Sequence, residues 1–160
     1  TGAKFTRLYF KDCYIDGTTD FIFGPSTALF ENCMIHSKRN SYVTAASTPK
    51  EAKYGYIFKH CKLTAEPGVD KVYLGRPWRP YAYTLFIECE LGKHIVPAGW
   101  HNWGKQSNEE TARYMEYKNT GEGANASERV AWSKQLTKKE AEAVTVDAIF
   151  RTQSDWDPID

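Results

Sequence analysis

The residue that most suggests chemistry is an acid set into an apolar segment. Asp20 lies within residues 17–24 (GTTDFIFG) and is followed at once by Phe21, Ile22 and Phe23. A carboxylate at the edge of an aromatic wall is costly unless it is paired or hydrogen-bonded. We therefore expect a cationic partner for Asp20. The pair would be either a structural ion pair or part of a functional site.

Other reaction centres have weaker signals in this sequence. No Ser stands between glycines as in a nucleophile elbow, and the four histidines are single residues in turn-like surroundings. No group of His and acidic residues has metal-ligand spacing. The four cysteines contain no close pair, so neither a zinc site nor a disulfide framework is indicated.

The cysteines instead mark an internal repeat. Each one follows a Phe by three residues and precedes an aliphatic residue by two, at Phe10-Cys13-Ile15, Phe30-Cys33-Ile35, Phe58-Cys61-Leu63 and Phe86-Cys89-Leu91. Side chains alternate between the two faces of a regular strand, so a Phe and a Cys three positions apart would point to opposite faces. A strand must therefore bend between them. The residues just before the cysteines, Asp12, Asn32, His60 and Glu88, are polar residues of the kind that suits a tight bend.

Successive copies are 20 to 28 residues apart. A repeat of this length is too small to bury its own apolar face, so the copies must stack. The gaps between them supply a third short strand, expected at residues 20–23, 42–45 and 72–74. The sequence therefore predicts an all-β solenoid of parallel strands, in which equivalent positions form ladders about 4.8 Å apart. The cysteines would form one inward-facing ladder of free thiols.

This stacking identifies the partner of Asp20. Arg76, in residues 74–78 (LGRPW), lies on the third strand two coils later, about 10 Å from Asp20 along the sheet. An extended Arg side chain covers most of that distance, and its planar fork can hold a carboxylate in the charged form. Trp78 would then offer a platform for a sugar ring, or would merely cover the solenoid wall. Arg79 and Tyr81 extend a cationic and aromatic surface suited to an acidic polysaccharide.

Residues 1–160 are expected to form one domain, with coils over 1–105 and a covering tail over 106–160. In the tail, residues 111–119 are a possible further strand. Thr137 and Glu140 form a capping box before a short helix, with Leu136, Ala141 and Val144 facing inward.

Composition excludes several partners. The chain has 21 Lys and Arg against 20 Asp and Glu, and this balance lacks the positive field of a nucleic-acid binder. No apolar run is long enough to cross a bilayer, and no secretory leader is seen at Thr1. We therefore expect no nucleic acid and no membrane as a partner.

Three segments taken together resemble the pectin methylesterase (pectinesterase) family: GTTDFIFG at 17–24, LGRPW at 74–78 and PAGWHNW at 97–103. The resemblance covers nearly the whole chain and corresponds to about the C-terminal half of the family's catalytic domain. It implies a right-handed parallel β-helix, truncated at its N-terminal end and followed by a short helical tail.

The resemblance also implies roles for four residues. Asp20 matches the family's nucleophile, Arg76 the arginine that binds it, Trp78 a substrate-contacting tryptophan and Phe23 a position lining the ester pocket. The implied reaction hydrolyses the C6 methyl esters of homogalacturonan through an acyl-enzyme and releases methanol. No metal or organic cofactor is implied. Action on pectin favours an extracellular or periplasmic location.

The chain departs from the family pattern in one respect. The family's acid/base aspartate and oxyanion-hole glutamine form a Gln-Asp motif shortly before the nucleophile strand, and no Gln-Asp pair occurs here. Asp12 and Asp16 do not replace it, because Asp12 occupies the repeated bend and Asp16 precedes a turn glycine. We therefore expect little or no esterase activity from these residues alone.

Other interpretations remain. The chain could be a non-catalytic polygalacturonate-binding β-helix that keeps Arg76 and Trp78. A polysaccharide lyase or a glycosidase is weaker, because these need a calcium site or two opposed carboxylates and one acid is apparent near Asp20. The coil near residues 8–15 would have an unpaired strand edge, which predicts self-association through this end.

Overall fold

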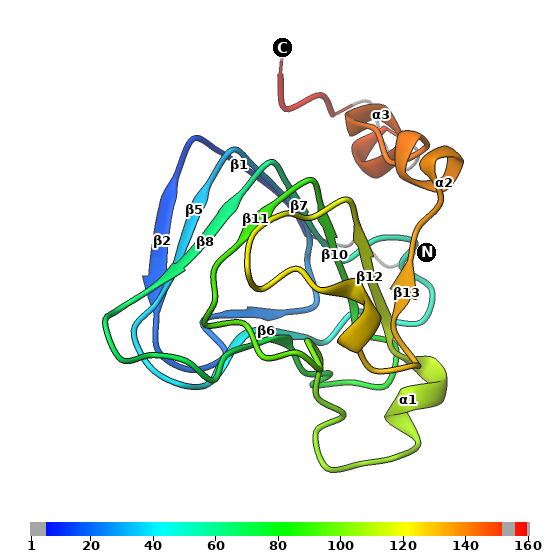
Figure 1. The fold of residues 1–160 in the computed structure, drawn as a ribbon. Helices are drawn as coiled ribbons and strands as arrows, with labels where there is room; N and C mark the ends of the chain where they lie inside the picture. The colour runs from blue at the N-terminus through cyan, green and yellow to red at the C-terminus, as the bar shows by residue number, and fades with distance from the viewer. Residues whose placement is uncertain (1–5, 152–155, 160) are drawn as a thin grey trace.

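The chain winds into coils whose strands stack in three parallel sheets (Figure 1). The computed structural model describes residues 6–151 and 156–159. The first sheet, in spatial order, contains β1 (Arg7–Lys11), β4 (Thr27–Glu31), β7 (Tyr56–Lys59), β10 (Tyr83–Ile87), β12 (Arg113–Tyr117) and β13 (Lys134–Gln135). The second contains β11 (Glu90–Leu91), β8 (Lys62–Ala65), β5 (Met34–Ser37) and β2 (Tyr14–Gly17). The third contains β3 (Ile22–Gly24), β6 (Tyr42–Ala46) and β9 (Tyr73–Gly75).

The predicted repeat is confirmed by the pairing register. The four Phe residues of the repeat, from Phe10 to Phe86, occupy one ladder of the first sheet. Their rings are stacked with centroid distances of 4.8, 4.5 and 4.4 Å. All four cysteines are free, three of them are buried and Cys13 is half-buried. In-register stacking of identical residues thus builds the core of a parallel β-helix, the fold that the sequence predicts.

The predicted bends are also present. Asp12, Asn32, His60 and Glu88 all have left-handed backbone conformations, with φ between 50° and 55°. Lys118 adopts the same conformation with φ of 46°, so a fifth bend follows β12. A left-handed residue between two strands reverses which face the side chains occupy, and this explains why the Phe and the Cys of each repeat both point inward.

Two sequence predictions need correction. Asp20 was expected to begin a strand, but it precedes β3 and has a φ of 50°, so it lies in a bend rather than in a regular strand. The coils were expected to end near residue 105, yet β12 pairs in parallel with β10 and places Tyr114 in the same core. The solenoid therefore continues into the region assigned to the tail.

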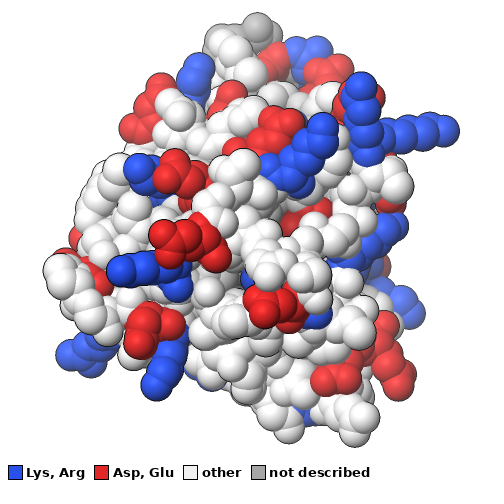
Figure 2. Space-filling model, in the orientation of Figure 1, with Lys and Arg blue, Asp and Glu red and all other residues white. Residues whose placement is uncertain are grey.

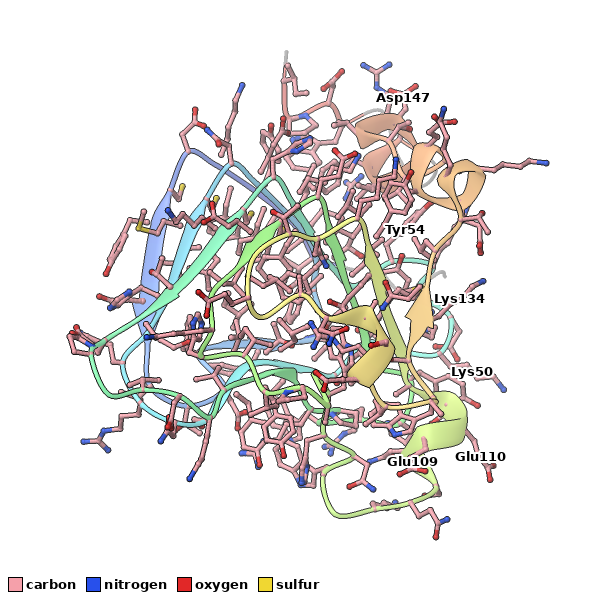
Figure 3. The ribbon with its side chains drawn as sticks, in the orientation of Figure 1. Lys50, Tyr54, Glu109, Glu110, Lys134 and Asp147 are labelled. Atoms are coloured by element: carbon pink, nitrogen blue, oxygen red, sulfur yellow. The ribbon has the colours of Figure 1, made fainter. Side chains whose placement is uncertain are left out.

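Residues 144–150 of the tail cover the outer face of the first sheet. Besides the short α1 (Asn108–Thr111) and a 3₁₀ turn (Ala126–Glu128), the tail contains α2 (Lys138–Glu142) and α3 (Val146–Phe150). The predicted Thr137–Glu140 capping box is present. A second apolar cluster joins the tail to the sheet through Val144, Ile149 and Phe150, which pack with Leu29, Tyr54, Ile57, Tyr83, Leu85 and Ile87. Tyr54, labelled in Figure 3, belongs to the loop before β7.

Charged side chains alternate in sign on the surface. Figure 2 shows basic and acidic groups interleaved on the face in view. Some of them pair between coils, as Lys62 Nζ does with Glu90 Oε1 at 3.7 Å and Lys38 Nζ with Asp16 Oδ2 at 3.5 Å. No helix among the described residues is long and apolar enough to span a membrane.

The strands β1, β2 and β3 lie at one end of the three sheets. Apolar side chains are exposed there, and Leu8 has an exposed fraction of 39% and Tyr14 of 59%. Self-association through this end stays a prediction.

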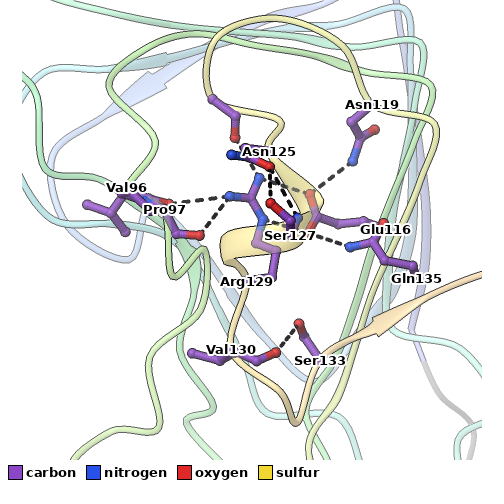
Figure 4. Close-up of polar contacts among 11 residues, drawn as sticks. Val96, Pro97, Glu116, Asn119, Asn125, Ser127, Arg129, Val130, Ser133 and Gln135 are labelled. Atoms are coloured by element: carbon purple, nitrogen blue, oxygen red, sulfur yellow. Dashed lines mark hydrogen bonds and ion pairs between the residues drawn. The ribbon is translucent and has the colours of Figure 1, made fainter.

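A buried ion pair fastens the last coil (Figure 4). Glu116 on β12 accepts hydrogen bonds from Arg129 Nε at 2.8 Å and Nη2 at 3.2 Å, and both side chains are less than 5% exposed. Asn119 and Gln135 also donate to this carboxylate, at 3.2 and 3.4 Å. Arg129 further donates to the carbonyl of Pro97 at 3.0 Å. The pair therefore connects β12, β13 and the loop after β11.

Replacing Glu116 by Gln should lower the free energy of unfolding by about 3–5 kcal/mol, because Arg129 would be left as an uncompensated buried cation. Urea denaturation measures the loss. Glu142→Gln is the matched control, since Glu142 pairs with Lys138 at 3.7 Å on an exposed helix face, and it should change stability by less than about 0.5 kcal/mol. Equal losses for the two variants would contradict the assignment.

His94 predicts a pH dependence of stability. Its side chain follows β11 and is only 3% exposed. Burial, reinforced by the nearby His36, lowers the pKa of His94 to about 4, against about 6.5 in an unfolded chain. Between these values the unfolded chain binds a proton that the folded chain does not bind. Stability should therefore fall by up to about 3 kcal/mol as the pH falls from 6.5 to 4.

Unfolding free energies measured between pH 7 and pH 4 check this prediction. The His94→Asn variant should lose part of the acid-side slope, whatever its stability at pH 7. The same slope in both proteins would assign the pH dependence to other groups.

Candidate active site

An acid and a guanidinium from different coils meet on the third sheet. Arg76 Nε donates to Asp20 Oδ1 at 3.0 Å, and Arg76 Nη2 donates to Asp20 Oδ2 at 2.6 Å. The Asp20 side chain is 20% exposed and the Arg76 side chain 22%, so the pair is partly sheltered and still reachable from solvent. The bidentate pairing predicted from the stacking argument is confirmed.

The register of the third sheet accounts for this contact. The backbone N–H of Asp20 donates to the carbonyl of Tyr42 at 2.9 Å, and Tyr42 on β6 pairs with Tyr73 on β9. Asp20 and β9, the strand that ends just before Arg76, are therefore two rungs apart, as predicted. The Arg76 side chain crosses the middle rung, and its Cζ lies 3.9 Å from the centre of the Tyr42 ring.

Gly75 allows β9 to approach closely just before Arg76. A Cβ at this position would overlap Oγ1 of Thr44 and would lie 3.3 Å from the Trp100 ring. Thr44 is itself held, because its hydroxyl donates to the carbonyl of Leu74 at 3.0 Å. Only glycine fits without displacing a buried neighbour, so the start of the Arg76 loop has a defined position.

Two exposed aromatic side chains lie together on this face. Phe23 on β3 and Trp78 beyond β9 have ring centroids 5.9 Å apart in an edge-to-face arrangement. Their exposed fractions are 63% and 42%, so the two rings together present an apolar surface to solvent. The backbone N–H of Trp78 donates to the carbonyl of Ala46 at 3.0 Å and fixes the start of its loop.

A model of the family described as Pectinesterase matches residues 3–153. The chain belongs to this family. It is 44% identical over 136 residues to pectinesterase 31 of Arabidopsis thaliana, covering 84% of this chain and 43% of that protein. The solved pectin methylesterase from carrot superposes with a TM-score of 0.86 at 33% identity, covering 93% of this chain and 51% of that one. A pectin methylesterase in complex with a hexasaccharide superposes with a TM-score of 0.82 at 32% identity, covering 96% and 52%.

This pectinesterase-family chain thus spans about half the length of these three relatives. Among its described residues, no group of three or more His, Cys, Asp and Glu side chains is arranged to hold a metal ion.

The structure adds site neighbours that the sequence did not reveal. The Trp103 ring lies over Arg76, with the Arg76 Cζ 4.0 Å from its centre. His101 packs edge-on against Tyr42 and Tyr73, at 5.5 and 5.3 Å. Tyr42 belongs to a predicted strand, and the register that placed Arg76 could have placed it too. Trp103 and His101 lie in a loop without periodicity. The one signal for them in the sequence is that they belong to the PAGWHNW segment of the family resemblance.

The basic and aromatic surface predicted beyond Trp78 is present. The Arg79 guanidinium lies 5.7 Å from the centre of the Trp78 ring, and Lys50 Nζ lies 5.3 Å from the centre of the Tyr81 ring. Lys50, labelled in Figure 3, comes from the loop after β6. Two loops of this pectinesterase-family chain therefore carry cations next to aromatic rings, the exposed Trp78 and the half-buried Tyr81.

Neighbouring groups shift the pKa values of two side chains in the site. Hydrogen bonding to Asp20 raises the pKa of Arg76 further above neutrality. Burial, and then the positive charge of Arg76, lower the pKa of His101. At neutral pH the site therefore places the permanent cation of Arg76 near a neutral His101 imidazole.

A double-mutant cycle should show strong coupling between Asp20 and Arg76. Unfolding free energies of Asp20→Asn, Arg76→Met and the double variant should give a coupling of about 1–3 kcal/mol, since both hydrogen bonds are charge-assisted and partly sheltered. The exposed inter-coil pair of Lys62 and Glu90, 3.7 Å apart, is the control and should couple by less than about 1 kcal/mol. If the two cycles agree, the site pair is no more than a surface contact.

Proposed function

We propose that this chain supplies the nucleophile, its arginine partner and part of the sugar-binding surface for hydrolysis of the C6 methyl esters of homogalacturonan. The observation that carries the proposal is the Asp20 carboxylate, held by Arg76 beside two exposed aromatic rings in a chain of the pectinesterase family. Phe23 would line the ester pocket, and Trp78 would stack against a galacturonate ring.

The proposed reaction begins with attack of one Asp20 oxygen on the ester carbonyl carbon. The C–O bond to the methoxy group then breaks, and the departing oxygen takes up a proton to give methanol. The acyl-enzyme that remains is a mixed anhydride between Asp20 and the galacturonate carboxyl group. Water adds to the acyl carbon and releases the free galacturonate carboxylate together with Asp20. Arg76 orients the attacking Asp20 carboxylate, and its positive charge stabilises that carboxylate again when the anhydride is hydrolysed.

The substrate class is supported by the surface around the pair. Arg79 and Lys50 provide positive charge beside Trp78 and Tyr81, and a polygalacturonate chain combines sugar rings with free carboxylates. A related pectin methylesterase was solved with a hexasaccharide. Because pectin is too large to be met in the cytosol, we place the site of action outside the cell.

The reaction also needs a proton donor and an oxyanion-hole donor. The family resemblance assigns these roles to a Gln-Asp motif, and the 160 residues contain no such pair. Asp16 is not a substitute, because it lies on the second sheet and pairs with Lys38 at 3.5 Å. We therefore propose that the turnover rate of the chain by itself is about four orders of magnitude lower than that of a complete pectin methylesterase.

Methanol release from methyl-esterified pectin tests both statements. At high protein concentration, the chain should release methanol slowly, and Asp20→Asn should remove this release. Turnover close to that of a complete relative would show that no further groups are needed. Release that is equal for the chain and for Asp20→Asn would remove Asp20 from the nucleophile role.

A binding experiment separates the enzyme from the alternative, a polygalacturonate-binding module. Partly methylated oligogalacturonides should bind the chain, and Trp78→Ala should weaken binding by about tenfold through the loss of ring stacking. Trp156→Ala is the matched control, because Trp156 is 38% exposed and packs against Phe150 in the tail. Binding without any Asp20-dependent methanol release would favour the binding module.

A further inference from the structure

Trp103 has an unusual backbone conformation. Its φ is 64°, the next residue, Gly104, has a φ of 67°, and the N–H of Lys105 donates to the carbonyl of Asn102 at 3.2 Å. This is a tight turn with both central residues in the left-handed region, where Gly, Asn and Asp are the usual residues. A bulky aromatic side chain is strained in this conformation.

Local hydrogen bonds maintain this strained turn. The N–H of Trp103 donates to His101 Nδ1 at 3.0 Å, and the N–H of Gly104 donates to Asn102 Oδ1 at 2.7 Å. Asn102 is held in turn, because its Nδ2 donates to Glu109 Oε1 at 3.1 Å. The lowered pKa of His101 agrees with an unprotonated Nδ1 that can accept a hydrogen bond.

The turn places the Trp103 ring on Arg76. The Arg76 Cζ lies 4.0 Å from the centre of this ring and 3.9 Å from the centre of the Tyr42 ring. Two rings at that distance cannot share one face of a planar guanidinium, so they cover its two faces. The edge of the guanidinium that carries Nε and Nη2 faces Asp20 and donates to it.

We propose that Trp103 is a positioning residue, which clamps the Arg76 guanidinium against Tyr42 so that its donor edge stays aligned with Asp20. The role in catalysis rests on the proposed function, whereas the clamp itself is a property of the folded chain. An arginine side chain has several rotatable bonds, and a sheet register alone does not fix the plane of its guanidinium. Two aromatic faces fix that plane, and the strain at Trp103 is the structural cost of bringing the second face into position.

Solvent exchange of the Arg76 Nε proton, followed by NMR with ¹⁵N-labelled arginine, tests the clamp without using activity. The proton should be protected in the unmodified chain, and Asp20→Asn should remove the protection and identify its signal. Trp103→Leu keeps an apolar side chain and loses the aromatic face, so it should accelerate exchange by about tenfold. Trp103→Phe keeps an aromatic face and should remain within about threefold of the unmodified chain.

Trp156→Leu is the control, since Trp156 has the same 38% exposed fraction and lies 5.3 Å from a different guanidinium, that of Arg7. It should leave the Arg76 proton unchanged. If Trp103→Leu does not fold, His101→Ala removes the acceptor of the Trp103 amide and should also accelerate exchange.

Unchanged protection in folded Trp103→Leu, or in His101→Ala when Trp103→Leu does not fold, would overturn the clamp and leave the proposed function intact. Conversely, a confirmed clamp in a chain without Asp20-dependent methanol release would overturn the proposed function alone.

Discussion

The site depends on parallel strands that stay in register from one coil to the next. Asp20 and Arg76 are far apart in the sequence, and they meet because β3, β6 and β9 pair without slippage. A slip of one residue would turn every side chain of a strand to the opposite face. The Phe ladder on the first sheet opposes such a slip, since each ring stacks on its equivalent in the next coil at 4.4–4.8 Å. The core thus helps to set the geometry of an ion pair on the surface.

Much of this arrangement could be predicted, because it follows from a periodic pattern. The Phe and Cys positions revealed the coils, the change of parity revealed the bends, and counting rungs brought Arg76 to Asp20. The conformation of Asp20 was not predictable in this way. Its φ of 50° places it in a bend, and a strand boundary of this kind depends on packing that one sequence does not show.

The contacts that were missed come from loops. Trp103 reaches Arg76 from a turn with two left-handed residues. Asn102 and Gly104 are usual turn residues, but nothing in the sequence indicates that Trp103 takes the other left-handed position. Arg129 reaches Glu116 after a loop and a 3₁₀ turn, and nothing in its spacing indicates a buried partner. Periodicity predicts which residues share a ladder. It does not predict which side chain a loop carries back onto the solenoid.

The Glu116–Arg129 and Asp20–Arg76 pairs have similar chemistry in different surroundings. Glu116 is at most 4% exposed and accepts from Arg129, Asn119 and Gln135, so its lone pairs are largely used. Asp20 is 20% exposed, and within the described part of the chain Arg76 is the side chain seen to donate to its carboxylate. A carboxylate with all its lone pairs engaged can hold a coil in place, but it cannot attack an ester. The lone pairs left on Asp20, beside the exposed Phe23 and Trp78, are therefore what the proposed nucleophile role requires and what Glu116 lacks.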